Sequence, residues 1–103
     1  MKLRAGQSLS SPVDTTTVVV IRAPGDDLEV TCAGVRLYDP RGDEAAPEGA
    51  ADPGQMDGTQ IGKRYADDDL GLELLVTKPG KGTLAVNGTP LGLKGAKPLP
   101  ASD

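Results

Sequence analysis

The sequence predicts a small all-β protein, and three observations indicate this fold class. Two separate segments are rich in β-branched and aliphatic residues, each contains a Pro-Gly turn, and each resumes an apolar pattern after that turn. The chain has 103 residues, a length that suits one domain or two small units sharing a core. We therefore expect a single β domain over residues 1–103 that contains two similar β-hairpin units.

The first unit covers residues 13–38. The run TTTVVVI at residues 15–21 is β-branched and predicts a strand. Residues 23–27 (APGDD) have the composition of a turn. Residues 28–32 (LEVTC) then alternate between apolar and polar, as a half-buried strand does, and the apolar pattern continues to Leu37. The pattern predicts a hairpin formed by these two strands.

A linker over residues 39–64 separates this unit from the next. It is rich in Pro, Gly, Ala and acidic residues, a composition that cannot pack a core, and we expect it to be mobile.

The second unit covers residues 65–94. The segment GLELLVT at residues 71–77 predicts a strand, a Pro-Gly turn follows, and residues 83–86 predict the returning strand. Asn87-Gly88 is a strong signal for a tight turn. The tail, residues 95–103, contains two prolines and is predicted to be extended.

Composition limits the classes of partner. The net charge is −4, and the only aromatic residues are Tyr38 and Tyr65. Such a chain lacks the basic patch and the stacking platforms that nucleic acids require, and no apolar run approaches the roughly 20 residues of a membrane helix. We expect neither nucleic acid nor membrane as a partner. With one cysteine and no recognisable signal peptide, we expect a cytoplasmic protein.

The two units resemble each other. Each has an aliphatic strand, a Pro-Gly turn, a second strand, and a glycine followed three residues later by leucine: Gly34 with Leu37, and Gly88 with Leu91. This pattern predicts an internal duplication. The alternative is that two short hairpins look alike by chance.

The second unit also resembles desulforedoxin, the small rubredoxin-like iron domain found at the N-terminus of desulfoferrodoxin. Residues 65–93 run alongside that family without a gap, and Leu91 replaces its methionine. The first unit fits more loosely, through residues 30–34 and Leu37. The identical positions are Tyr65, Gly71, Val76, Gly80, Gly82, Thr83, Leu84 and Gly88. The resemblance implies a tandem of desulforedoxin-like hairpin units.

This chain differs from that family at the positions of the metal-binding cysteines. Its Cys-x-x-Cys positions hold Asp67 and Leu70, and its Cys-Cys pair is Val86 and Asn87. A tetrahedral sulfur site needs four thiolates, and Cys32 is the only cysteine. The resemblance therefore implies the scaffold and argues against the family's metal and electron transfer, so we expect no cofactor.

No catalytic motif stands out. The chain has no histidine, so triads built on Ser-His-Asp or Cys-His are impossible. We expect Cys32 to be a buried structural thiol. Asp67-Asp68-Asp69 lacks the alternating spacing of a calcium loop and is interpreted as a solvated turn. Residues 58–64 (GTQIGKR) lack the spacing of a phosphate loop.

Two segments are candidates for binding a partner. Lys63, Arg64 and Tyr65 form a basic-aromatic patch that could pair with a partner's carboxylate. They could also anchor the linker to the sheet. Pro98, Leu99 and Pro100 lie in the tail, where proline lowers the entropy lost on docking. That tail could enter a partner groove, lie along the protein's own sheet edge, or be disordered.

The sequence thus favours a non-catalytic binding or accessory protein that associates with itself or with another protein. The alternative is a metal-binding or redox protein in which Cys32 shares ligands, such as Asp67, with a second subunit.

Overall fold

A computed structural model describes residues 2–25, 27–42 and 46–93, and the all-β fold class is confirmed. Nine strands lie within these residues and no helix does. They are β1 (Ser8–Ser10), β2 (Thr17–Arg22), β3 (Val30–Cys32), β4 (Val35–Arg36), β5 (Arg64–Asp67), β6 (Leu72–Lys78), β7 (Leu84–Val86), β8 (Thr89–Pro90) and β9 (Gly92–Leu93).

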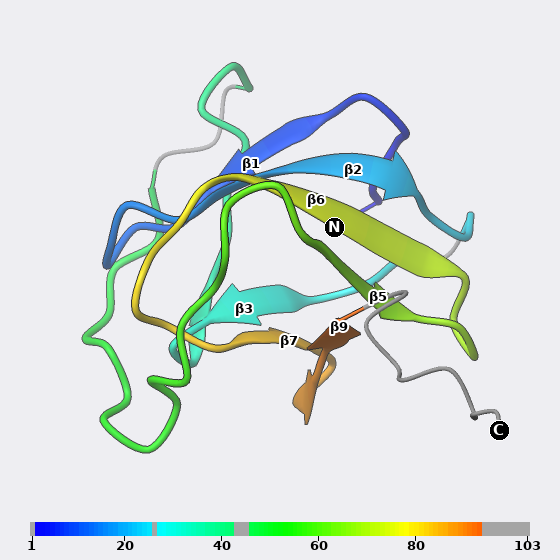
Figure 1. Cartoon of the computed structure of the whole chain (residues 1–103). Helices are drawn as coiled ribbons and strands as arrows, with labels where there is room; N and C mark the ends of the chain where they lie inside the picture. Colours follow the sequence, from blue (N-terminus) through cyan, green and yellow to red (C-terminus); the bar gives the residue numbers. More distant parts are fainter. Residues whose placement is uncertain (1, 26, 43–45, 94–103) are drawn as a thin grey trace, which may run out of the picture.

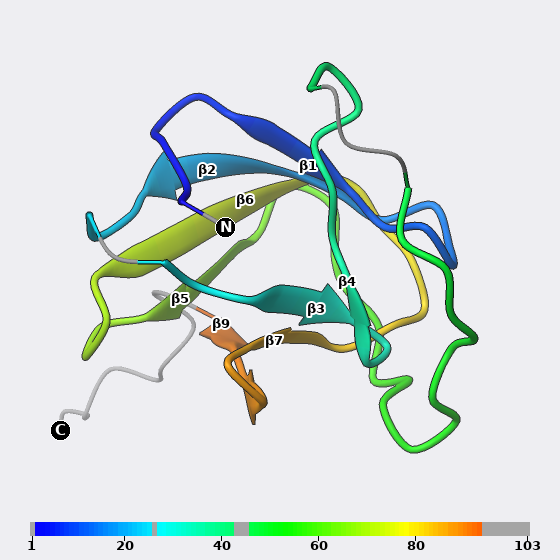
Figure 2. The same cartoon turned by 180° about the vertical axis from the view of Figure 1, so that it is seen from behind.

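The strands form two antiparallel sheets that face each other (Figure 1). One sheet has five strands in the order β1-β2-β6-β5-β9, and the other has four in the order β4-β3-β7-β8. The two sheets are joined at both sides. Tyr38, just after β4, forms a bridge with Ser10 of β1, while β8 runs through Leu91 directly into β9 (Figure 2). The sheets therefore close on each other as a small flattened barrel.

The expected hairpins between the two strands of each unit are wrong. β2 pairs with β1 and β6, and β3 pairs with β4 and β7, so the Pro-Gly segment after β2 crosses from one sheet to the other. The segment between β6 and β7 crosses in the same way. The reason is burial: crossing places the apolar sides of the two strands on opposite sides of one shared core, so that each covers the other, whereas an isolated hairpin would leave both apolar sides exposed to water.

The core is aliphatic, as the composition requires. Period-two alternation puts Val18 and Val20 of β2 and Leu72, Leu74 and Val76 of β6 inside, where each is almost completely buried. The opposing sheet contributes Val30, Cys32, Leu84 and Val86, and the connecting segments add Leu3, Leu9, Leu28, Leu37, Tyr65 and Leu91.

The tight turn predicted at Asn87-Gly88 is confirmed. It joins Val86 to Thr89, and both turn residues have positive φ, 50° and 86°, as a type I′ hairpin turn requires. The β3–β4 turn has the same form at Ala33 and Gly34, with φ of 52° and 82°. Ala33 shows that tertiary packing can hold a non-glycine residue in this region.

The pairing pattern recurs in the two halves of the chain. The Leu37 N–H donates to the Val30 carbonyl at 2.9 Å, and the Leu91 N–H donates to the Leu84 carbonyl at the same distance. Ser10 pairs with Tyr38, as Ala66 of β5 pairs with Gly92 of β9. The hydrogen-bonding pattern that recurs includes β1, and β1 lies outside the first hairpin unit expected at residues 13–38. Duplication itself stays a prediction.

The described part of the expected linker is hydrogen-bonded to the barrel. The Asp52 N–H donates to the Ala33 carbonyl at 2.8 Å, and the Thr83 N–H donates to the Gln55 carbonyl at 2.9 Å. Thr59 is buried, and its N–H donates to the Gly80 carbonyl at 3.0 Å. Composition alone missed this attachment because backbone groups make it, and these are the same for every residue type except proline.

The expected extended tail, residues 95–103, lies outside the described residues. Within the described part of the chain, no helix has the length and apolar character needed to cross a membrane.

At Gly82 the β6–β7 connection packs closely against Cys32 and the backbone of Ala33. A Cβ there would lie 2.5 Å from Cys32 Sγ and 2.9 Å from the Ala33 nitrogen. We expect Gly82→Ala to lower the free energy of unfolding by more than about 2 kcal/mol, because backbone must shift. Urea unfolding measures this change.

Gly92→Ala is the matched control, since a Cβ there meets nothing within 4 Å. Equal unfolding midpoints for the two variants would contradict the close packing at Gly82.

Candidate partner-binding face

The three residues of the predicted basic-aromatic patch differ in exposure: Lys63 and Arg64 are exposed, whereas Tyr65 is buried. Tyr65 is 7% exposed and belongs to the core, so its ring is not available to a partner. Its hydroxyl accepts a hydrogen bond from the Gln60 N–H at 3.1 Å, and the Lys63 N–H donates to the Gln60 carbonyl at 3.2 Å. These contacts match the alternative in which the patch anchors the linker to the sheet. Only Lys63 and Arg64 remain exposed for binding.

The tail candidates Pro98, Leu99 and Pro100 lie outside the described residues.

Arg64 belongs to a larger surface, the side of the five-stranded sheet that faces away from the core. We call this surface the outer face. Side chains alternate between the two sides of a strand, and this alternation identifies the outward residues of β2, β5 and β6. The pairings Val19–Leu75 and Arg64–Leu75 show which of these residues are neighbours across the strands. Its members are Thr17, Val19, Ile21, Arg22, Arg64, Ala66, Glu73, Leu75 and Thr77.

The centre of the outer face is aliphatic. Val19 and Leu75 are opposite each other and half-buried, and Ile21 is 38% exposed. The register of β2 and β6 shifts between Val20 and Arg22, so Ile21 and Arg22 both lie beside Glu73. The outer side of a one-sided antiparallel sheet is normally polar. This strip of branched side chains therefore departs from the usual pattern.

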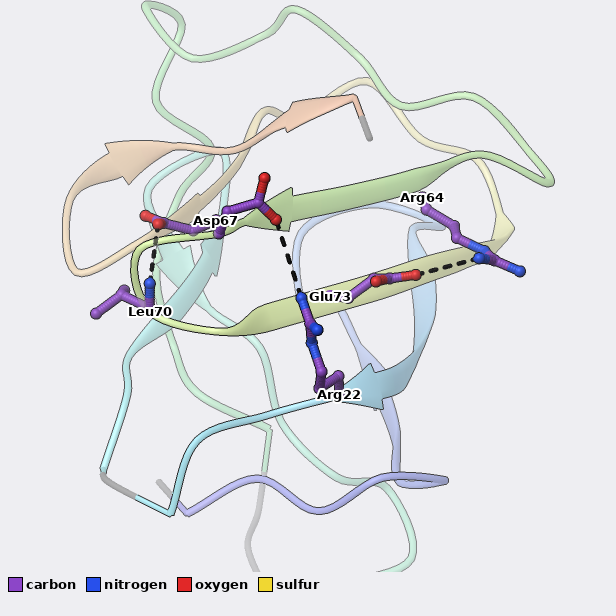
Figure 3. Close-up of polar contacts among 6 residues, drawn as sticks. Arg22, Arg64, Asp67, Leu70 and Glu73 are labelled. Atoms are coloured by element: carbon purple, nitrogen blue, oxygen red, sulfur yellow. Dashed lines mark hydrogen bonds and ion pairs between the residues drawn. The ribbon is translucent and has the colours of Figure 1, made fainter. Parts of the chain in front are cut away.

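Ion pairs border the aliphatic strip (Figure 3). The Arg64 Nη1 is 3.3 Å from Glu73 Oε2, and Glu73 is 5% exposed although it lies on the outer face. The Arg22 Nη2 is 3.9 Å from Asp68 Oδ1, and both of these side chains are largely exposed. The Glu73 carboxylate helps to hold the Arg64 guanidinium in position, because removing a cation from a buried carboxylate costs free energy.

Of the three carboxylates at residues 67–69, Asp67 ends β5 and Asp68 and Asp69 begin the β5–β6 turn. Asp67 Oδ1 accepts a hydrogen bond from the Leu70 N–H at 3.2 Å (Figure 3), while Asp68 and Asp69 are exposed. The interpretation of this run as a solvated turn is confirmed for these two residues. Among the described residues, no group of three or more histidine, cysteine or acidic side chains could hold a metal ion.

Cys32 is 0% exposed, and its sulfur lies 3.6 Å from both Asp14 Oδ2 and Thr16 Oγ1. Burial raises the pKa of the thiol, hydrogen bonds from the side chains of Thr16 and Ser11 act in the opposite direction, and the charge of Asp14 raises the pKa further. A buried thiol with a raised pKa is a weak nucleophile. The expected burial of Cys32 is confirmed.

Asp14, which sequence reasoning missed, ties the β1–β2 turn to the β6–β7 connection. Its Oδ2 accepts hydrogen bonds from the N–H groups of Lys81 at 3.0 Å and Gly82 at 2.9 Å, and its Oδ1 accepts one from the Thr16 N–H at 2.8 Å. Burial of the carboxyl would raise its pKa, but hydrogen bonds from Thr16, Gly82 and Ser11 outweigh burial and lower it to about 2. Asp14 is therefore a structural clamp.

Glu73 and Arg22 were also missed. A signal for Glu73 is present, since a charged residue between Leu72 and Leu74 marks the outward side of an alternating strand. Its burial depends on pairing with β5, which the sequence does not reveal.

Comparisons of the chain with protein-family models, with curated proteins and with solved structures give no match.

We expect the Asp14 clamp to make stability depend on pH. The pKa of Asp14 falls from 3.8 to about 2 on folding, so its contribution is complete above pH 3.8 and is lost as pH falls toward 2, where the unfolded chain binds the proton first. Allowing for solvent screening, Asp14→Asn costs about 1 kcal/mol at neutral pH. Urea unfolding of both proteins between pH 7 and 2 measures the difference.

The difference between the two proteins should shrink across that acidic window. Glu48→Gln, which changes an exposed carboxylate outside both the clamp and the outer face, is the control and should stay close to the unmodified protein. A difference that stays constant down to pH 2 would contradict the role of the carboxylate.

Proposed function

We propose that this chain is a non-catalytic binding protein that works as a symmetric pair, and that the outer face is where a second copy binds. The observation that carries the proposal is the aliphatic strip of the outer face, bordered by charges of opposite sign at its two ends. An apolar centre with a polar rim is the usual composition of a protein–protein interface.

The charges favour a second copy as the occupant. Lys63, Arg64 and Lys78 lie at one end of the β5–β6 pair, and the exposed carboxylates of Asp68 and Asp69 lie at the other end, in the turn, where Asp68 is paired with Arg22. A two-fold axis through the middle of the face reverses the strand direction in the second copy. The basic end of each copy then faces the acidic end of the other, which is the self-complementarity of a two-fold interface.

The centre of the face supplies the apolar contact. Val19, Ile21 and Leu75 would meet the same residues across the axis and lose their remaining exposure. Arg64 is already oriented by Glu73, so less side-chain entropy is lost when it contacts a carboxylate of the second copy.

The resemblance to desulforedoxin fits this proposal as a scaffold assignment. The matched hydrogen bonds at Leu37 and Leu91 support a tandem of two related units. The loss of the family's cysteines supports a binding role without its metal.

The alternative with Cys32 as a ligand shared between subunits is less well supported. The thiol has no exposed surface, so a second subunit could reach it only after the barrel opened.

Charge exchange tests the pairing. In the full chain, Lys78→Glu, at the position that pairs with Thr17 of the outer face, and Asp69→Lys should each weaken the dimer by about 2- to 30-fold, because each places like charges opposite each other at two symmetry-related positions. The double variant restores opposite charges and should recover affinity close to that of the unmodified protein. Sedimentation equilibrium at low salt measures the dissociation constants.

Glu48→Lys is the matched control, since Glu48 is exposed and adjoins Gly49, which packs against Val35 of the other sheet. A protein that stays monomeric at about 100 µM, a concentration at which even weak dimers form, would overturn the proposal. A double variant no better than either single variant would overturn the two-fold arrangement.

A further inference from the structure

A pocket of about 430 Å³ lies beside the outer face, between the chain entering β1 and the loop after Tyr38, and one of its lining residues, Ser8, pairs with Val19. This volume falls within the roughly 300–1,000 Å³ typical of sites for small molecules. Arg4, Gln7 and Ser8 line one wall, and Asp39, Arg41 and Gly42 line the other.

Backbone hydrogen bonds hold the first wall in place. The Gly6 N–H donates to the Val20 carbonyl at 2.7 Å, the Val20 N–H donates to the Gln7 carbonyl at 2.8 Å, and the Gln7 N–H donates to the Arg4 carbonyl at 3.0 Å. This wall is therefore fixed to β2, a central strand of the barrel.

The second wall is fixed in the same way and tied to the first. Tyr38 exchanges two backbone hydrogen bonds with Ser10, at 2.8 and 3.0 Å, and the Gly42 N–H donates to the Asp39 carbonyl at 3.0 Å. The Gln7 Nε2 donates to Asp39 Oδ2 at 3.0 Å across the pocket. Because both walls are preformed, a ligand would lose little free energy in ordering them.

The charges in the pocket indicate what it would bind. A hydrogen bond from the Gln7 side chain and one from the Arg41 N–H lower the pKa of Asp39, and the positive charges of Arg41 and Arg4 lower it further. Two guanidinium groups on opposite walls thus act on one carboxylate. Neither forms an ion pair with another residue in the part of the chain that the structure describes. These three side chains carry a net single positive charge in a protein of net charge −4.

We propose that this pocket binds a small monocarboxylic acid that also carries hydroxyl groups. The ligand carboxylate lies between Arg4 and Arg41, whose planar donor groups match a carboxylate. The ligand hydroxyl donates to Asp39, each of whose oxygens keeps a further lone pair. The negative charge of Asp39 disfavours a dianion such as phosphate, which sets the specificity. The site adjoins the outer face at Ser8, which pairs with Val19, but its binding groups Arg4, Asp39 and Arg41 are not among the residues of that face, so the proposal does not require the pairing.

Titration of the full chain with gluconate, followed by amide NMR shifts of Gln7 and Arg41, tests the proposal. We expect saturable shifts with a dissociation constant on the order of 1 mM, a typical value for a small polar ligand. Acetate, which lacks hydroxyls, should bind several-fold more weakly. Glucose, which lacks the carboxylate, and inorganic phosphate should give no saturable shift.

Variants locate the binding site. Arg4→Gln and Arg41→Gln should each weaken gluconate binding by at least about tenfold, because each removes a charge-assisted pair. Lys81→Gln removes an exposed positive charge outside the pocket and should leave binding unchanged. Absence of gluconate shifts, equal binding of phosphate, or equal binding by the arginine variants would each overturn the assignment. Sedimentation is measured separately, so failure here is distinguishable from failure of the pairing.

Discussion

Neither half of this chain can complete its own sheets, and the rest of the structure depends on that constraint. β2 has β6 as a neighbour in one sheet, and β3 has β7 as a neighbour in the other. Each central pair thus joins a strand from before residue 40 to one from after residue 60. The core, the outer face and the Asp14 clamp all include residues from both halves. A change that loosens either central pairing would therefore affect all three.

Much of the fold class could be predicted from the sequence, because strands leave a local signal. The β-branched run contains most of β2, the alternating segment 28–32 contains the shorter β3 (Val30–Cys32), and Asn87-Gly88 is a turn, since turn geometry depends on the residues within it. The pairing of the strands could not be predicted in this way. A Pro-Gly segment between two strands fits a hairpin and a crossing between sheets equally well, and only burial of both apolar sides against one core distinguishes them.

In the candidate sites too, the sequence predicts local features but not the contacts made by tertiary packing. Lys63 and Arg64 were identified from their charge, but Tyr65 was grouped with them, and only tertiary packing reveals that its ring belongs to the core. Asp14 matters because its partners, Lys81 and Gly82, lie far along the sequence, and Glu73 matters because it pairs with Arg64 on the neighbouring strand β5. The pocket between Arg4 and Arg41 joins segments that no short motif connects.

The interleaving of the two halves has a consequence for the order in which the protein can form. On the ribosome, β2 and β3 emerge well before β6 and β7 exist, so their aliphatic edges have no partners during that interval. Closing the long intervening loop must precede the gain from the central pairings, a requirement that slows folding in proteins dominated by distant contacts. The Lys, Asp and Pro residues around these strands would then also limit premature association of nascent chains.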